Sequence, residues 1–429
     1  MKNQTIAVLG LWHLGSVTAA CLAEHFSSVI GFDYCKHTID KLNHGIPPIL
    51  ETDLQQLIHK GLSLGRLKFT TNLDDLQKAD FFWITIDTKL DDLDQCELED
   101  LYKLFRQLAN KDISHKYIIS SQIPVGTCEK LLQLIPQKRK PKIAYIPENL
   151  QLGKSITGFQ NPDMLVIGSD DQDYLQTLIQ LTSSIYKQPT SCSLRTAEFS
   201  KHAINCFLAT SISFSNELAE LAVAMEADAY KITEIMRKDK RIGKKLPLFP
   251  GPWFSGGTLA RDLRSVQAIS KKVNRSSKIF DAVISINEHR IAYFIERLAK
   301  YIELTQAKIA ILGLVYTEGT DTLRRSPGIQ LAKKLIEKGA LINAFEPMIS
   351  HAQLCSEPIN LFSSALAAAT DTDIVIFLRA GCAKDLELSK LAQVMQGNIL
   401  FDLWDLYDKD IVKEVGLNYI KLGINDEKI

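Results

Sequence analysis

One short apolar run occurs twice in this chain, once near the N-terminus and again after residue 300. Ile6-Ala7-Val8-Leu9-Gly10-Leu11 and Ile309-Ala310-Ile311-Leu312-Gly313-Leu314 are almost identical. An apolar run of this kind, ending in glycine, is typical of a strand buried on both faces in a parallel sheet. Each run is followed by a helical stretch and by a second strand that ends in an acid, Asp33 or Glu346. The repeat therefore predicts two βαβ domains.

The middle of the chain has a different pattern. Residues from about 196 to 300 show long helical periodicity, rich in Ala, Leu and Glu, without strand-like alternation. Further core strands are predicted at 143–146, 164–167 and 374–377. We therefore expect an α/β protein with two Rossmann-like, doubly wound parallel-sheet domains, residues 1–195 and 301–429, joined by a long central helical region, residues 196–300.

Composition excludes several classes of partner. A length of 429 residues suits two or three domains of about 150 residues each. Fifty basic and fifty acidic side chains cancel, so no net charge favours nucleic acid or an anionic membrane. No apolar run approaches the roughly 20 residues that span a bilayer, and the N-terminus enters a strand pattern without a signal sequence. We expect a cytoplasmic protein that binds neither nucleic acid nor membrane.

The eight cysteines are scattered. They show neither the CxxC pairing of a zinc site nor the density of a disulfide scaffold, so no metal is predicted and most are expected in the core. Cys206 adjoins Asn205 on a predicted helix. Adjacent helical residues point about 100° apart, so Cys206 is not expected to act beside Asn205.

The first predicted strand leads into a turn typical of dinucleotide-binding domains. The turn reads Gly10-Leu11-Trp12-His13-Leu14-Gly15, and Asp33 ends the next strand. Gly10 and Gly15 would shape the turn, the helix start at His13 and Leu14 would receive the pyrophosphate, and Asp33 would hold the ribose 2′-hydroxyl. An acid at this position opposes a 2′-phosphate. The predicted cofactor is therefore NAD and not NADP.

Trp12 departs from this fingerprint, because it stands at the second glycine, where the backbone approaches the phosphates most closely. Two interpretations of a functional site stay open: the indole turns outward, or it packs over the cofactor. Poor cofactor binding, or a strand-helix turn without a ligand, would also fit the sequence.

A glycine-rich segment, residues 251–262, has the form of a ligand-binding loop. It reads GPWFSGGTLARD. Glycines let a backbone pass close to a ligand, and Arg261-Asp262 places a phosphate-seeking cation beside a carboxylate. Taken alone, the segment could also be an ordinary glycine-rich surface loop.

Four polar residues are predicted to share one face of a helix. Steps of three, four and eleven residues return to nearly the same direction, which groups Glu198, Lys201, Asn205 and Asn216. Such a stripe would be costly to bury without partners. We expect the face to line a cleft or to meet complementary groups, with a solvated helix face as the alternative.

These segments resemble the motifs of the UDP-glucose/GDP-mannose dehydrogenase family. In that family the loop runs Gly-Phe-Gly-Gly, one residue, then Cys-Phe-Pro-Lys-Asp, and Thr258 stands at the cysteine. The other motifs that carry the resemblance lie at 47–51, 121–127, 147–150, 198–205, 241–243 and 320–327. The resemblance spans nearly the whole chain. It implies an N-terminal cofactor domain, a central helix that mediates dimerisation, a C-terminal nucleotide-sugar domain and a setting in polysaccharide biosynthesis.

The resemblance also implies roles for single residues. Lys201 and Asn205 coincide with the family's catalytic lysine and asparagine, Asp262 and Glu148 with its catalytic carboxylates, and Thr258 with its nucleophile. Contacts with the cofactor are implied for Thr88, Gln122, Arg261 and Arg324, and contacts with the sugar nucleotide for Leu150, Phe254 and Gly256.

Four further positions depart from the family's pattern. Gln122 replaces a threonine, Leu152 replaces a glutamate, Thr317 follows Tyr316 where the family has lysine, and Trp404 replaces an arginine. Two cations are thus lost from an anion site. Their loss suggests a modified substrate or weaker binding.

The residue types fit the first oxidation at C6 of a sugar nucleotide. Asp262, through a water, can take the proton, while Lys201 and Asn205 stabilise the developing alkoxide. The family's second oxidation uses a thiohemiacetal on cysteine. Thr258 would need a dedicated base, and its segment holds no histidine. An aldehyde hydrate could still give up a second hydride, so uronate formation is expected to be slowed.

The sequence is therefore interpreted as an NAD-dependent nucleotide-sugar 6-dehydrogenase that acts as a homodimer, with its second oxidation impaired. Two alternatives stay open. One is single-hydride redox or epimerase chemistry on the same scaffold. The other is a pseudoenzyme that binds NAD or a nucleotide sugar, favoured by Trp12 and Thr258 and opposed by the intact Lys201, Asn205 and Asp262.

Overall fold

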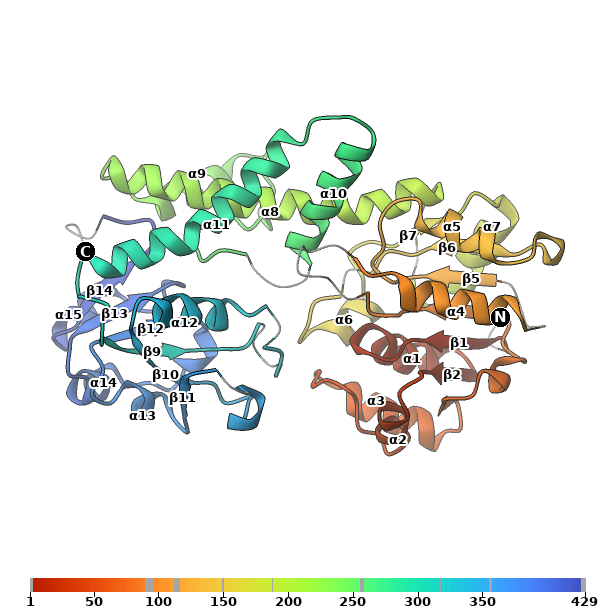
Figure 1. Cartoon of the computed structure of the whole chain (residues 1–429), viewed down its shortest axis with the longest axis horizontal. Helices are drawn as coiled ribbons and strands as arrows, with labels where there is room; N and C mark the ends of the chain where they lie inside the picture. Colours follow the sequence, from red (N-terminus) through yellow and green to blue (C-terminus); the bar gives the residue numbers. More distant parts are fainter. Residues whose placement is uncertain are drawn as a thin grey trace. The chain divides into compact units, whose positions relative to one another are not determined.

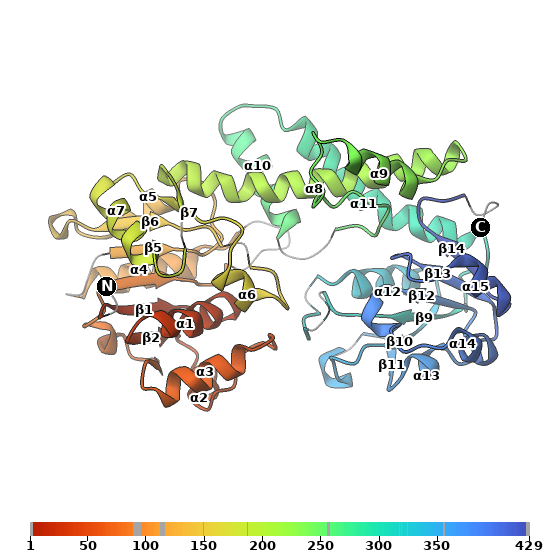
Figure 2. The ribbon, with the colours of Figure 1, turned by 180° about the vertical axis from the view of Figure 1, so that it is seen from behind.

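The computed structural model divides into two compact units, Met1–Ile204 and Asn205–Ile429. It describes residues 3–88, 96–111, 116–148, 150–186, 188–254, 258–316, 318, 320–323, 325–354 and 357–425. Figures 1 and 2 show, from opposite sides, helices beside both faces of a sheet in each unit. The units are described separately.

The first unit is built on an eight-stranded sheet in the order β3-β2-β1-β4-β5-β6-β7-β8. The strands are β1 (Thr5–Leu9), β2 (Ser28–Phe32), β3 (Leu67–Thr70), β4 (Phe81–Ile84), β5 (Lys116–Ile119), β6 (Lys142–Tyr145), β7 (Val166–Gly168) and β8 (Thr190–Cys192). Neighbouring strands are parallel, except that β7 meets β6 in an antiparallel pair, Tyr145 opposite Gly168. The first six strands follow the order of dinucleotide-binding folds.

Helices cover both faces of this sheet because alternate strand residues face opposite cores. Ile6 and Val8 of β1 pack with α1, α3, α6 and α7, whereas Ala7 and Leu9 pack with α4 and α5. The helices of the unit are α1 (His13–His25), α2 (Lys36–Asn43), α3 (Leu54–Ser63), α4 (Glu99–Ala109), α5 (Thr127–Leu134), α6 (Ser155–Gln160) and α7 (Gln172–Thr182), with the 3₁₀ turns η1 (Leu73–Leu76) and η2 (Gln137–Arg139).

The second unit repeats the same strand order in a six-stranded, wholly parallel sheet, β11-β10-β9-β12-β13-β14. The strands are β9 (Lys308–Leu312), β10 (Leu341–Phe345), β11 (Ile359–Phe362), β12 (Ile374–Phe377), β13 (Ile399–Asp402) and β14 (Asn418–Lys421). The repeated apolar run supplies β1 in one sheet and β9 in the other. The predicted pair of Rossmann-like sheets is thus confirmed.

The predicted helical region contains α8 (Leu194–Ala224), α9 (Ala229–Lys238), α10 (Leu259–Lys272) and α11 (Lys278–Ala299). Beyond β9 the second unit adds α12 (Pro327–Glu337), α13 (Ala365–Ala369), α14 (Leu388–Val394), α15 (Lys409–Glu414), η3 (His351–Leu354) and η4 (Ala380–Cys382). The division into three domains, with boundaries at residues 195 and 300, stays a prediction. Across the ranges that the structure describes, no helix is long and apolar enough to cross a membrane.

Candidate active site

The turn between β1 and α1 requires its two glycines. Gly10 has φ +95°, and a Cβ on Gly15 would lie 1.7 Å from the carbonyl oxygen of Gly10. His13 and Leu14 open α1, and Asp33 follows β2. One oxygen of Asp33 accepts the Leu11 N–H at 2.8 Å. A tight turn, a helix N-terminus and a fixed carboxylate lie together here, and these features fit a dinucleotide.

Trp12 is 46% exposed and precedes α1 as its N-cap. An exposed indole fits both of its predicted positions, turned outward or packed over a cofactor.

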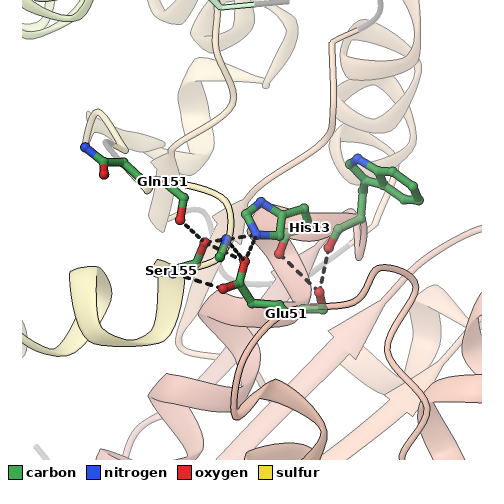
Figure 3. A network of polar contacts seen from close by, with 7 residues as sticks. His13, Glu51, Gln151 and Ser155 are labelled. Carbon is green, nitrogen blue, oxygen red and sulfur yellow. Dashed lines mark hydrogen bonds and ion pairs between the residues drawn. The ribbon is translucent and has the colours of Figure 1, made fainter. Parts of the chain in front are cut away.

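A buried carboxylate ties this turn to the loop before α6 (Figure 3). Oε2 of Glu51 lies 2.8 Å from Nε2 of His13 and accepts the N–H of Gly153 at 3.0 Å and the hydroxyl of Ser155 at 2.9 Å. Oε1 accepts the N–H of Ser155 at 3.2 Å. An ionised carboxylate only accepts hydrogen bonds, so Nε2 of His13 carries the proton in this pair.

The environment of Glu51 favours its charged form. Burial raises the pKa of Glu51, but hydrogen bonds from His13, Gly153 and Ser155 outweigh burial and hold the pKa below its usual range. The sequence indicated Glu51 only as the last residue of the motif at 47–51. Its partners are distant in the chain, so only the fold shows what it binds.

Two residues expected to contact the cofactor and one expected catalytic carboxylate lie after neighbouring strands of the first sheet. Thr88 follows β4 and Gln122 follows β5, and the Thr88 hydroxyl donates to the Gln122 carbonyl oxygen at 2.7 Å. Glu148 follows β6, and Nζ of Lys201 donates to its main-chain carbonyl oxygen at 2.5 Å. Leu150 packs its side chain against the core that holds α1 and α6. The structure therefore joins Thr88 to Gln122, and Lys201 to Glu148.

The polar face of α8 is buried, so the solvated-face alternative is wrong. Glu198 is fully buried and accepts the N–H groups of Gly126 and Cys128, at 2.5 and 2.9 Å, where α5 begins. Asn216 binds the segment that starts at Gly251. Glu198 and Asn216 thus hold other segments of the chain, a role that the helical pattern alone did not reveal.

In the second unit, Asn205 of α8 meets Asp262 of α10. The side-chain amide of Asn205 donates to Oδ2 of Asp262, and the exposed fractions are 5% and 0%. Thr258 is the N-cap of α10, and its carbonyl oxygen accepts the N–H of Asp262 at 3.1 Å. Arg261 is also buried. Three predicted residues, Thr258, Asp262 and Asn205, thus form one continuous arrangement.

Phe254 and Cys206 belong to the hydrophobic cluster under this site. The cluster also contains Leu263 of α10 and Val283 of α11. Burial, helped by Asp262, raises the pKa of Cys206 to about 12. Cys206 is therefore a core residue, as expected, and cannot stand in for the thiol missing at position 258. Gly256 and Arg324 lie outside the described residues.

Trp404 fills the position where the resemblance implies an arginine. Its indole N–H donates to the carbonyl oxygen of Leu378 at 2.7 Å, and its ring lies 5.6 Å from that of Phe249. This position is occupied by aromatic packing in place of a cation.

Three family models match consecutive parts of the chain. They are the NAD binding domain (residues 4–190), the central domain (195–289) and the UDP binding domain (310–409) of the UDP-glucose/GDP-mannose dehydrogenase family. The chain belongs to this family. It is thus an NAD-dependent nucleotide-sugar dehydrogenase, and its NAD binding domain, residues 4–190, contains the turn and Asp33 described above.

Similar proteins span the same length. The UDP-glucose 6-dehydrogenase of Rickettsia bellii is 30% identical over 97% of this chain and 99% of its own. YwqF of Bacillus subtilis, also a UDP-glucose 6-dehydrogenase, is 29% identical, with 97% of each chain covered. A UDP-glucose dehydrogenase from Pyrobaculum islandicum has a TM-score of 0.88 at 26% identity, covering 97% of both chains. A UDP-D-ManNAc dehydrogenase from Pyrococcus horikoshii has 0.87 at 25%, covering 99% and 100%.

Proposed function

We propose that this dehydrogenase oxidises C6 of a UDP-activated hexose with NAD, and that its second oxidation, from aldehyde to uronate, is slow. The observation that carries the proposal is the buried pair of Asn205 and Asp262, one helical turn after Thr258. The UDP binding domain model and the names of the relatives support the choice of nucleotide.

In the first oxidation the substrate hydroxyl loses a proton while its carbon loses a hydride. NAD, when bound, accepts that hydride at its nicotinamide ring. Asp262 takes the proton through a water, and the amide of Asn205 holds the carboxylate in place. Lys201, one turn before Asn205 on α8, supplies the positive charge that stabilises the developing alkoxide.

The second oxidation lacks its usual nucleophile. Thr258 is an alcohol, which needs an adjacent base before it can attack an aldehyde. The buried Cys206 offers no thiolate in its place. The remaining route to the uronate is the aldehyde hydrate, formed by water addition with the help of Glu148; the hydrate would give up a second hydride to NAD and a proton to solvent. That route forms no covalent intermediate, so the aldehyde is released or accumulates first.

The presence of Trp404 favours a substrate different from that of the relatives, or a weaker affinity for the sugar nucleotide. Its packing against Phe249 and its bond to Leu378 leave no cation at this position. One fewer positive charge weakens an anion site.

The protein is also proposed to act as a homodimer through α8. Phe207, Phe214 and Leu221 recur every seven residues on this helix and are 58%, 48% and 61% exposed. Large apolar side chains in such a row are typical of a protein–protein interface. Light scattering should give the mass of a dimer, and Phe214→Asp should lower it to that of a monomer. A monomeric wild-type protein would contradict the proposed homodimer.

Incubation with NAD and a panel of nucleotide sugars tests the activity. NADH is expected with at least one UDP-hexose and with none of the matching free sugars. Absence of NADH across the panel would favour the pseudoenzyme alternative. Epimerised product without net NADH would favour the other alternative, chemistry by a hydride that is taken and returned.

A further inference from the structure

Residues 251–254 form a largely buried segment without regular secondary structure, shortly before Thr258 in the chain. Gly251, Trp253 and Phe254 are buried. Buried backbone N–H and C=O groups need hydrogen-bond partners, and a segment outside helices and sheets has to find them elsewhere.

Side chains of two helices provide these partners. Asn216 of α8 accepts the N–H of Gly251 at 3.1 Å and donates to the carbonyl oxygen of Pro252 at 3.3 Å. Asn287 of α11 accepts the N–H of Phe254 at 2.8 Å and donates to its carbonyl oxygen at 2.9 Å, as a neighbouring strand would. The segment is therefore fixed at both of its ends.

Arg290 of α11 completes the arrangement. Its Nε and Nη2 donate to the carbonyl oxygen of Gly251 at 3.2 and 3.1 Å, and its Nη1 pairs with Glu220 at 2.8 Å. Arg290 is 1% exposed, and burial lowers its pKa. A buried ion pair adds little stability, and an apolar side chain would avoid the cost of desolvation. The planar guanidinium is the group that can hold one carbonyl with two donors while it pairs with a carboxylate.

The anchored segment packs against the helix that carries the proposed base, Asp262. A Cβ on Gly251 would lie 2.6 Å from the ring of Phe249, so the segment passes too close to this ring for a side chain at position 251. Phe254 packs with Leu263 in the cluster beneath α10, the helix that carries Asp262. Phe254 is thus held by Asn287, and Asp262, at the start of α10, is held by Asn205.

We propose that Asn287 and Arg290 are positioning residues, which fix residues 251–254 beneath α10 so that Thr258 and Asp262, at the start of this helix, meet the reacting carbon in one geometry. This inference rests on the proposed function. Positioning groups of this kind contribute to the rate by removing the freedom of the reacting parts, and they do so without touching the substrate.

Arg290→Lys and Asn287→Ala test this inference. The lysine keeps the charge but loses the paired bond to Gly251. Each variant should lower kcat by roughly 10- to 100-fold, with a smaller change in the KM for NAD, because the turn at residues 10–15 and Asp33 lie in the other unit. Arg297→Lys is the matched control, since Arg297 is another buried arginine of α11 but donates to the main-chain carbonyl oxygens of Lys421 and Ile424 in place of that of Gly251. Its kcat should stay within about twofold of wild type.

Hydrogen exchange supplies a readout that does not depend on activity. The N–H group of Phe254, whose acceptor is Asn287, should exchange faster in Asn287→Ala than in the wild type, and at the wild-type rate in Arg297→Lys. If the wild type oxidises no nucleotide sugar, the proposed function fails while the exchange rates still report whether the segment is anchored. The inference is overturned if Arg290→Lys and Asn287→Ala keep kcat within twofold of wild type, or if exchange at residues 251–254 does not change.

Discussion

Asn205 donates a hydrogen bond from its side-chain amide to Oδ2 of Asp262, and both side chains are buried. A buried carboxylate needs such a donor, and this one comes from the helix that also carries Lys201. Asp262 is thereby fixed one turn after Thr258. The proposed base and the position of the missing thiol thus share one short piece of structure.

Asn205→Ala should lower kcat for the first oxidation by about 10- to 100-fold, because Asp262 loses the donor that orients it. The KM for NAD should not change. Asn343→Ala is a matched control, since Asn343 also donates from its amide, to the carbonyl oxygen of Ala368, but lies away from Asp262. Steady-state kinetics with the best nucleotide sugar compare the two, and equal rates would remove Asn205 from the mechanism.

Lys201→Ala should lower turnover by roughly 100-fold or more, as the loss of a preorganised charge does. Lys201 is 8% exposed and also holds the Glu148 carbonyl, so thermal unfolding has to show that the variant still folds. The exposed Lys231→Ala serves as the control. Turnover close to wild type in a folded Lys201→Ala protein would show that another group stabilises the alkoxide.

NAD should raise the unfolding temperature and NADP should not, because Asp33, as the proposed ligand of the ribose 2′-hydroxyl, would repel a 2′-phosphate. A ligand that binds only the folded state stabilises it by about 2.7 kcal/mol at 100 times its Kd. Asp33→Ser should narrow the difference between the two cofactors. Equal shifts in the wild type would contradict the role given to Asp33.

Glu51 should make stability depend on acid pH. Its pKa is lowered in the fold, so its contribution is complete above the unfolded-state pKa and is lost as pH falls through the lower folded value. Glu51→Gln should cost roughly 1.5–3 kcal/mol at neutral pH and less as the pH falls below 4.5. Glu24→Gln, at a surface pair with Lys60, should cost little at any pH. Denaturant unfolding across pH measures both.

The two sheets could be predicted because their signal is local. The six residues Ile6–Leu11 are enough to predict a buried strand followed by a turn, and the repeat at Ile309–Leu314 predicts the same for the second sheet. The antiparallel pairing of β7 with β6 was not predicted, because an apolar run carries no direction.

The partners within the site could not be predicted by the same means. Helical spacing placed Glu198 and Asn216 on one face of a helix. It did not show that Glu198 would bind the N–H of Gly126, or that Asn216 would bind the N–H of Gly251. Glu51 and Ser155 are far apart in the chain, and no local pattern joins them. Contacts of this kind follow only from the fold. The same holds for the two hydrogen bonds from Arg290 to the carbonyl oxygen of Gly251.

Thr258→Cys should speed the oxidation of the 6-aldehyde by about tenfold or more, because a thiolate near Arg261 attacks without a further base. The first oxidation should not change. Thr210→Cys, in the middle of α8, controls for the added thiol. Feeding the 6-aldehyde directly isolates this step, and an unchanged rate would mean that the site serves another reaction.

The stoichiometry of NADH tests the central claim most directly. Purified protein, excess NAD and a limiting amount of the best UDP-hexose should first give one NADH per hexose consumed, with the 6-aldehyde present as product and a slower second phase. Two NADH per hexose from the start, with no aldehyde at any time, would contradict a second oxidation slowed by Thr258. No NADH with any nucleotide sugar would contradict the proposed activity itself.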